Sequence, residues 1–209
     1  FVSGLFNVIG GAERWRVAEI DAAGAVTPWV LATRPDSLYL LAPGEGGGLI
    51  VASTLTATGH VPRSRLAAFD LTTGALLPWA PVADGPVDVL GATPGRVTIG
   101  GRFTTIDGQP AAAAAALDAV TGARLPWAAS APGTATFTDS DWFYWAAGPP
   151  VNGPQVMERY SLATGALDPA WRLPFGGRVG AQEGDVLFVG SSLGLAAIDR
   201  RTARVRWFA

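Results

Sequence analysis

Two stretches of this chain carry the same pattern: Leu66-Ala67-Ala68-Phe69-Asp70-Leu71-Thr72-Thr73-Gly74 leads to Leu77-Pro78-Trp79, and Ala115-Ala116-Leu117-Asp118-Ala119-Val120-Thr121-Gly122 leads to Leu125-Pro126-Trp127. Self-similarity of this kind is typical of repeat architectures. Weaker copies are centred on Asp21 with Gly24 and Trp29, on Ser161 with Gly165 and Trp171, and on Asp199 with Thr202 and Trp207. The chain therefore contains five units of one repeat.

The spacing of the repeated tryptophans indicates the size of the unit. Trp positions 29, 79, 127, 171 and 207 are separated by 50, 48, 44 and 36 residues, in and around the range of four-stranded propeller blades. Each unit carries short alternating or β-branched runs separated by Gly, Pro, Asp and Thr. Residues of these types end strands and form hairpin turns, and the apolar residues do not recur with the helical period of 3.6 residues. The sequence predicts an all-β fold.

The third unit gives the clearest strand prediction. We expect an inner strand over Val87–Ala92, a second over Val97–Phe103, a third over Ala113–Asp118 and an outer strand over Arg124–Ala128. The alanine run beginning at Ala111 fits a helix equally well on local propensity. Sibling units hold less helical sequence at the same place, so a strand is favoured.

These units predict a β-propeller array of about five four-stranded blades over residues 1–209. The approximate blades are 1–32, 33–81, 82–130, 131–173 and 174–209. The first blade is expected to be incomplete, because the sequence begins at its second strand. Propellers remove their sheet edges by closing a ring, so we expect the array to be part of a larger ring or a longer chain.

The recurring Asp and Trp residues are interpreted as structural. An Asp followed by Thr-Gly can accept backbone N–H bonds within its own hairpin, and the Gly supplies a positive φ. Calcium repeats place several oxygen ligands in one loop, whereas each of these turns carries one Asp. A Trp at the same place in every blade suits packing between blades. The structural residues are Asp21, Asp70, Asp118, Asp199, Trp29, Trp79, Trp127, Trp171 and Trp207.

Composition argues against several classes of function. The net charge is −2 and the fifteen basic residues are all Arg without a clustered stripe, which argues against nucleic-acid binding. There is no Cys and one histidine, His60, so thiolate chemistry and His-rich metal sites are excluded. The longest apolar runs fall far short of the roughly 20 residues that a membrane-spanning helix needs. We expect no catalytic residues, no metal and no cofactor.

Two segments carry a resemblance to a known repeat family. Residues 100–110, with the Ala-Leu-Asp, Thr-Gly and Pro-Trp motifs that follow, resemble the delta-60 type repeat of bacterial secreted β-propellers, and so does the passage from His60 to Asp70. The Asp, Thr-Gly and Trp pattern is more distantly similar to quinoprotein-like propeller repeats. Those enzymes need adjacent cysteines and a calcium site, so their cofactor does not carry over to a chain without Cys. The delta-60 resemblance implies an extracellular or cell-surface bacterial protein.

A non-enzymatic scaffold or recognition module is the leading functional hypothesis. The loops between second and third strands emerge on one side of a propeller and vary most from unit to unit, so they are the expected binding face for a protein or a carbohydrate. The candidate binding residues are Glu13, Arg14, His60, Arg63, Asp107, Gln109, Asn152 and Gln155.

Two alternatives stay open. A carbohydrate-active enzyme domain could use Asp and Glu residues dispersed over several blades, and would need two carboxylates roughly 5 to 10 Å apart in a cleft. A structural subunit of a surface assembly would instead show a large apolar patch rimmed by polar residues.

Overall fold

The computed structural model describes residues 1–32, 40–44, 48–52, 56–58, 60–111, 113–126, 133–148 and 155–209. Within these residues every regular element is a β-strand, and all strand pairs are antiparallel. The described residues contain no helix of the length and hydrophobicity that a membrane span requires. The all-β prediction is therefore confirmed for the described part of the chain.

The third unit forms a complete blade. Strands β10 (Val87–Thr93), β11 (Arg96–Gly101), β14 (Ala114–Asp118) and β15 (Arg124–Leu125) pair in this order into one sheet. The alanine run thus enters a strand, although Ala is the best helix former. Ala115 and Leu117 are almost completely buried in the core that this sheet shares with its neighbour, so packing outweighs propensity here.

Two further four-stranded sheets follow in the chain. One contains β16 (Gly133–Thr138), β17 (Trp142–Ala147), β18 (Val156–Ser161) and β19 (Leu167–Leu173). The last contains β20 (Arg178–Glu183), β21 (Val186–Ser191), β22 (Gly194–Asp199) and β23 (Val205–Phe208). Each strand pairs with the next one in sequence, so both blades are simple meanders.

The first two units hold smaller sheets in the described residues. Strands β5 (Leu40–Pro43), β6 (Gly48–Ala52) and β9 (Leu66–Asp70) form three strands of one sheet, and a single bridge from Phe69 to Leu76 marks the place of a fourth. In the first unit β1 (Val2–Ser3) pairs with β4 (Val17–Ala18). The structure thus shows a propeller-like arrangement of four blades; counting the first unit as a fifth blade remains a prediction.

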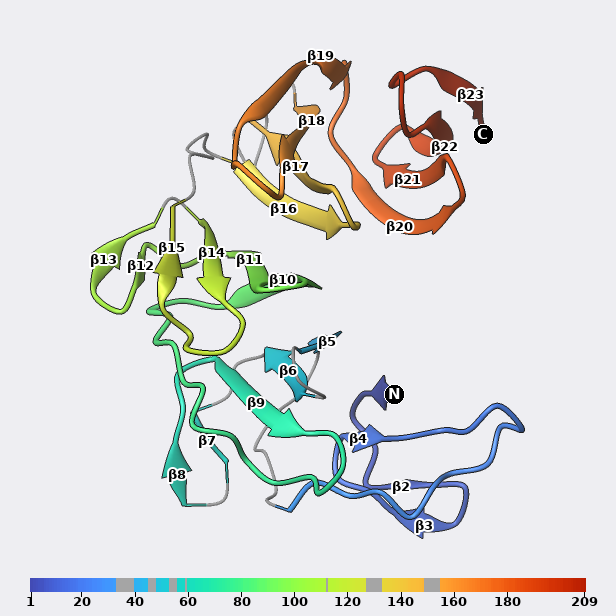
Figure 1. The fold of residues 1–209 in the computed structure, drawn as a ribbon. Coiled ribbons are helices and arrows are strands. Elements are labelled where there is room, and N and C mark those ends of the chain that lie inside the picture. Colours follow the sequence, from blue (N-terminus) through green and yellow to red (C-terminus); the bar gives the residue numbers. More distant parts are fainter. Residues whose placement is uncertain are drawn as a thin grey trace.

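The blades stack along the chain through their inner strands. Strand β10 contacts both β5 and β16, and β16 also contacts β20, so the successive sheets lie side by side (Figure 1). We call the side of a blade toward the next blade in sequence its forward face, and the side toward the preceding blade its rear face. Buried apolar side chains fill the space between a forward face and the following rear face.

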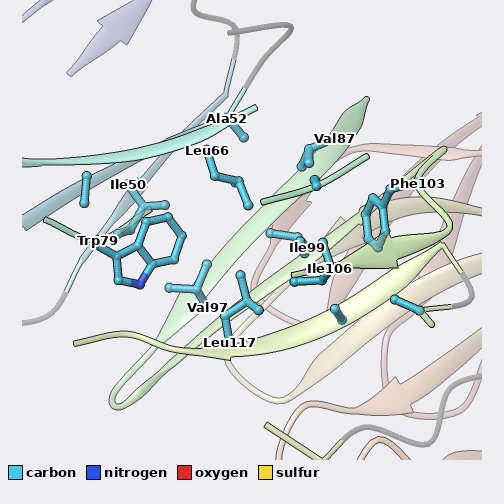
Figure 2. Close-up of a cluster of buried hydrophobic side chains, with 14 of the residues drawn as sticks. Ile50, Ala52, Leu66, Trp79, Val87, Val97, Ile99, Phe103, Ile106 and Leu117 are labelled. Carbon is cyan, nitrogen blue, oxygen red and sulfur yellow. The ribbon is translucent and has the colours of Figure 1, made fainter. Parts of the chain in front are cut away.

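Figure 2 shows this arrangement between the second and third blades. The indole of Trp79 lies on the forward face of the second blade and is 3% exposed. The rear face of the third blade packs against it with branched aliphatic side chains. Among the labelled residues, Ile50, Ala52, Leu66 and Trp79 belong to the forward face, and Val97, Ile99 and Leu117 to the rear face.

Candidate functional site

The loops between second and third strands of the first three units fold into small hairpins of their own. These are β2 (Val8–Ile9) with β3 (Ala12–Glu13), β7 (Ala57–Thr58) with β8 (Val61–Pro62), and β12 (Thr105–Ile106) with β13 (Gln109–Pro110). In Figure 1 the three hairpins lie apart from one another, each beside its own blade. The loop face predicted from the sequence is therefore a set of separate projections.

The turns of two hairpins explain their sequences. Gly10 and Gly11 have φ values of 56° and 76°, and Asp107 and Gly108 have 50° and 73°. Two-residue hairpin turns of the primed types demand positive φ at their central positions, which favours Gly, Asn and Asp. Asp107 is thus at a position that its backbone conformation selects.

Two predicted binding residues, Arg14 and Arg63, are used inside the fold. The Nη2 atom of Arg14 donates to the carbonyl of Thr27 at 2.5 Å, and that of Arg63 donates to the carbonyl of Leu77 at 3.0 Å. Each Nη1 also donates to the carbonyl of the preceding residue. Thr27 and Leu77 each stand directly before the Pro-Trp pair in the outer part of their unit. The two guanidinium groups therefore connect the hairpins β2–β3 and β7–β8 to the outer part of their own units.

Asp107 is also held by the fold. Its Oδ1 atom accepts the backbone N–H of Val82 at 2.8 Å, and its own N–H donates to the carbonyl of Val82. Nearby, Asp84 accepts the N–H groups of Thr104 and Thr105 at 2.7 and 3.0 Å. These bonds fasten the segment that enters the third blade to the hairpin β12–β13.

The remaining candidates lie at the surface. Glu13, His60 and Gln109 are exposed, and Gln155 is half-buried. Glu13 accepts the indole N–H of Trp15 at 3.1 Å, and together with Arg14 these side chains line a hollow of about 240 Å³ in the first unit. Asn152 lies outside the described residues.

The repeated Asp residues cap their own hairpins. Oδ1 of Asp70 accepts the N–H groups of Thr72 and Thr73 and the Thr73 hydroxyl, at 2.7 to 3.0 Å. Asp118 and Asp199 make the same three bonds with the residues two and three positions later. In the fourth blade Ser161 stands at this place, and its hydroxyl accepts the N–H of Thr164.

These bonds lower the pKa values of the hairpin carboxyls. The Thr73 hydroxyl and backbone N–H hold the pKa of Asp70 below its usual range, and the N–H and hydroxyl of Thr121 do the same for the pKa of Asp118. For Asp199 the guanidinium of Arg206 is the largest cause of the lowered pKa. In each case the charged form is the one that is bonded.

We therefore expect acid to weaken the fold. A carboxyl whose pKa is lower in the folded than in the unfolded chain contributes stability above its unfolded pKa of about 4, and this contribution is lost as the pH falls through the folded value. The urea midpoint should fall between pH 6 and pH 3. Asp118→Asn should show a smaller fall than the wild-type chain; equal pH dependence in both would contradict this role of Asp118.

The repeated tryptophans join consecutive blades. Trp79 Nε1 donates to the carbonyl of Asp118 at 3.0 Å, and Trp171 Nε1 donates to the carbonyl of Arg200 at 2.8 Å. Both acceptors lie at the Asp hairpin of the next blade. Trp29 packs near the rear face of the second blade. Trp127 lies outside the described residues.

A polar cluster between the last two blades was not predicted from the sequence. Arg200 donates from Nε to Asp139 at 2.7 Å and from Nη2 to Asp141 at 2.6 Å. Arg159 donates from Nε and Nη2 to Asp168 at 2.9 and 2.6 Å, and its guanidinium lies 3.9 Å from the ring centroid of Trp142. We call Asp139, Asp141, Arg159, Asp168 and Arg200 the interblade cluster.

Burial and charge shape the acidity of this cluster. Burial by itself raises the pKa of the Asp139 carboxyl, but bonds from Arg200 and from the N–H groups of Asp141 and Trp142 bring the pKa below its ordinary value. Burial first, and then the negative charge of Asp139, raise the pKa of Tyr144, whose hydroxyl donates to Asp139 at 2.9 Å. Asp139 is thus an anion and Tyr144 a neutral donor at neutral pH.

The described residues contain no group of three or more His, Cys, Asp or Glu side chains placed to hold a metal ion. Asp139 and Asp141 both form ion pairs with the guanidinium of Arg200, which lies between the two carboxylates. The two carboxylates therefore connect the fourth blade to the last blade.

No family model and no curated protein matches this sequence. Similar solved structures include the computationally designed Ika8 protein, with a TM-score of 0.54 and 13% identity over 84% of this chain and 49% of that one. The designed Ika4 protein has a TM-score of 0.51 and 14% identity over 85% and 94%. BamB from Moraxella catarrhalis has a TM-score of 0.45 and 19% identity over 82% and 53%. This chain thus spans about half of Ika8 and of BamB. At these identities the likeness to the designed proteins concerns the fold alone.

Proposed function

We propose that this chain is a non-enzymatic β-propeller module that acts outside the cell or at the cell surface as a scaffold or recognition module. The proposal rests on one observation: many charged side chains of this chain bind groups of the chain itself. Arg14 and Arg63 bind backbone carbonyls, and the hairpin Asp residues and the interblade cluster bind groups of the same chain. Side chains committed in this way hold the scaffold together.

The surface left for recognition consists of the hairpin tips. Glu13, His60 and Gln109 belong to three different hairpins, are exposed, and differ in charge and hydrogen-bonding capacity; Glu13 lies at the end of β3 away from its turn, His60 in the turn before β8, and Gln109 at the start of β13. A rigid scaffold that presents different side chains on similar loops is the usual arrangement of recognition modules. A protein or a carbohydrate is the partner that this proposal assigns to the tips.

Two measurements test this function. Purified chain is incubated with cell-surface polysaccharides, and released reducing ends are assayed; we expect none, and turnover would support the alternative of a carbohydrate-active enzyme. Protease accessibility on intact cells of the source organism should place the protein at the surface. A protein recovered in the cytosol alone would contradict the proposed location.

The tips themselves are tested by the double substitution His60→Ala and Gln109→Ala. Because both side chains are exposed, we expect the free energy of unfolding to change by no more than about 0.5 kcal/mol. Binding to intact cells or to isolated surface polysaccharide should fall at least tenfold. The matched control is Arg63→Ala, which should lose roughly 1 kcal/mol of stability with its carbonyl bonds. Full binding by the double variant would exclude these tips.

A second candidate function is a structural subunit of a surface assembly. It is favoured by apolar side chains that one face of the last blade exposes, among them Leu195 and Trp207. Exposed apolar patches of this kind mark interaction surfaces when they are contiguous.

A further inference from the structure

A hollow lies between the forward face of the second blade and the Asp118 hairpin of the third. Its volume is about 330 Å³, and its wall includes Ile50, Ala68 and Trp79 of the second blade and Ala119 of the third. Ile50 and Trp79 of this wall are labelled in Figure 2. Ligand pockets of proteins have volumes of roughly 300 Å³ and more, so the hollow is large enough to take a small group.

The sheet register identifies the equivalent place in the fourth blade. Ala68 of the second blade pairs with Ile50, and Arg159 of the fourth blade pairs with Tyr144. Ala68 and Arg159 each lie two residues before the hairpin-capping position of their unit. Arg159 therefore occupies in the fourth blade the place that Ala68 occupies in the second.

The fourth blade fills this place with its own side chains. The guanidinium of Arg159 lies 3.9 Å from the ring centroid of Trp142 and 5.3 Å from that of Trp171. Its Nη1 donates to the carbonyl of Arg200 in the next blade at 2.6 Å. A flat group thus lies between the two blades and against two indoles.

The second blade keeps its repeated tryptophan, Trp79, but lacks the group that fills this place in the fourth. Gly48 and Ala68 stand where the fourth blade has Trp142 and Arg159. The two small residues replace a flat cationic group and one of the two rings, and both of them line the hollow. The hollow is therefore the space that a stacked side chain occupies in the fourth blade.

The wall determines which chemistry suits the hollow. Among the described residues that line it, none carries a charge, and the indole N–H of Trp79 already donates to the carbonyl of Asp118. A cation would lose its hydration here without gaining a carboxylate partner, which Arg159 has in Asp168. An uncharged aromatic ring can stack on an indole without this cost, and a dry apolar cavity of about 150 Å³ already holds benzene.

The rim of the hollow favours a ring that is attached to a polypeptide. Val120 of the third blade is apolar yet 70% exposed, and Pro78 of the second blade is exposed as well. A free ring inside the hollow would leave both side chains in water, whereas the residues that flank an aromatic side chain would cover them. Aromatic side chains are enriched in protein interfaces, where they anchor the contact in pockets.

We infer that the hollow between Trp79 and Ala119 is a docking pocket for an uncharged aromatic side chain of a partner protein. The pocket adds a second site to the proposed recognition module. None of its described lining residues belongs to the hairpins β2–β3, β7–β8 or β12–β13. Failure of this inference would therefore leave the proposal for the hairpin tips standing.

The first test uses N-acetyl-phenylalaninamide, an aromatic side chain on a short piece of peptide backbone. Binding is followed by NMR through the indole N–H signal of Trp79, which is assigned by its absence from Trp79→Phe. We expect saturable binding with a dissociation constant on the order of 1 mM, the affinity that a ligand of this size can reach. N-acetyl-argininamide should bind more weakly by roughly tenfold or more.

Three outcomes of this titration would overturn the inference. The first is a Trp79 signal that the phenylalanine probe leaves unchanged. The second is equal or tighter binding of the arginine probe, because the pocket would then select a cation. The third is binding of benzene without binding of the phenylalanine probe, because the hollow would then accept free rings only.

Filling the hollow provides a matched pair of variants. Ala68→Leu places an aliphatic side chain inside it and should weaken binding of the phenylalanine probe by roughly tenfold or more. Ala75→Leu adds the same atoms at an exposed position of the same blade outside the hollow and should bind like the wild type. Circular dichroism verifies folding, and Ala119→Leu fills the hollow from the third blade if Ala68→Leu is not folded. Equal binding by the filled and wild-type chains would place the probe elsewhere, and the inference would fall.

A peptide selection tests the partner. Random peptides displayed on phage and selected on the purified chain should be enriched in sequences with an aromatic residue. These peptides should lose affinity for Ala68→Leu and keep it for Ala75→Leu. Val120→Ser should weaken the peptides and leave the small probe unaffected, because only a peptide reaches the rim. Enriched peptides without an aromatic residue, or with full affinity for Ala68→Leu, would exclude a polypeptide partner at this pocket.

Discussion

Trp171→Ala is expected to lower the free energy of unfolding by roughly 3 to 5 kcal/mol, the range for removing a buried aromatic side chain. Trp171 is 1% exposed and lies between the last two blades. The substitution removes its edge-to-face contact with Tyr144 and its bond to the carbonyl of Arg200, and leaves a cavity beside the guanidinium of Arg159. Few single changes remove contacts to both blades at once.

The measurement is urea unfolding followed by circular dichroism, combined with hydrogen exchange. In a repeat array each unit contacts its neighbours, so losses at one interface need not unfold every blade together. We expect amides of β20 to β23 to lose protection first. Trp171→Phe keeps most of the apolar volume and should cost much less. Trp207→Ala is the matched control, because its indole is exposed in the single chain; a loss as large as that of Trp171→Ala would contradict the role assigned to burial.

The propeller could be predicted because its signal is repeated. The Asp and Gly positions of each unit predict a turn, and the Trp position predicts a packing residue. Even the weak copies therefore support the assignment of a propeller repeat. The alanine run illustrates the strength of this information. Locally it favours a helix, but the same slot in other units, such as Leu66–Asp70, is a strand, and the structure has a strand at both places.

The candidate binding residues show what the repeat does not reveal. The sequence predicts Arg14 and Arg63 as binding residues on loops, yet each donates to a carbonyl 13 or 14 positions later in the chain. Both residues stand seven positions before the hairpin Asp of their unit, Asp21 and Asp70, and this shared position in the repeat indicates a structural role. Asp107 likewise bonds a residue 25 positions earlier. Such bonds depend on how loops meet in space, which short-range patterns do not encode.

The interblade cluster is harder to predict from the sequence than the hairpin contacts of Arg14, Arg63 and Asp107. Arg200 reaches Asp139 and Asp141 across about sixty residues, and nothing in the repeat marks any of these three positions. The aromatic density of β17 is the one sequence signal for this region, since the equivalent strands β6, β11 and β21 contain mostly aliphatic and small residues. Their density is explained by the structure: Trp142 covers the guanidinium of Arg159, and Tyr144 bonds to Asp139.

Asp139→Ala is the second substitution with a large expected effect. The carboxylate accepts four bonds: from Nε of Arg200, from the hydroxyl of Tyr144, and from the N–H groups of Asp141 and Trp142, at 2.7 to 2.9 Å. Its side chain is 6% exposed and that of Arg200 is 15% exposed. Removing Asp139 leaves the largely buried Arg200 with only the exposed Asp141 as a charged partner and also leaves the Tyr144 hydroxyl without its acceptor, so we expect a loss of about 3 to 5 kcal/mol.

The matched control is Asp141→Ala, because Asp141 binds the same guanidinium while its side chain is 61% exposed. An exposed partner contributes at most about 1 kcal/mol, so equal losses from both substitutions would refute the buried pair as the main interaction.

The pH dependence of stability gives a second readout through Asp139→Asn, which removes the charge and keeps the shape of the side chain. The lowered pKa of Asp139 means that its charge stabilises the fold above pH 4 and ceases to do so as the carboxyl is protonated. The stability difference between the wild-type chain and Asp139→Asn should therefore shrink from pH 6 to pH 3, and a constant difference would show that shape, not charge, accounts for the loss.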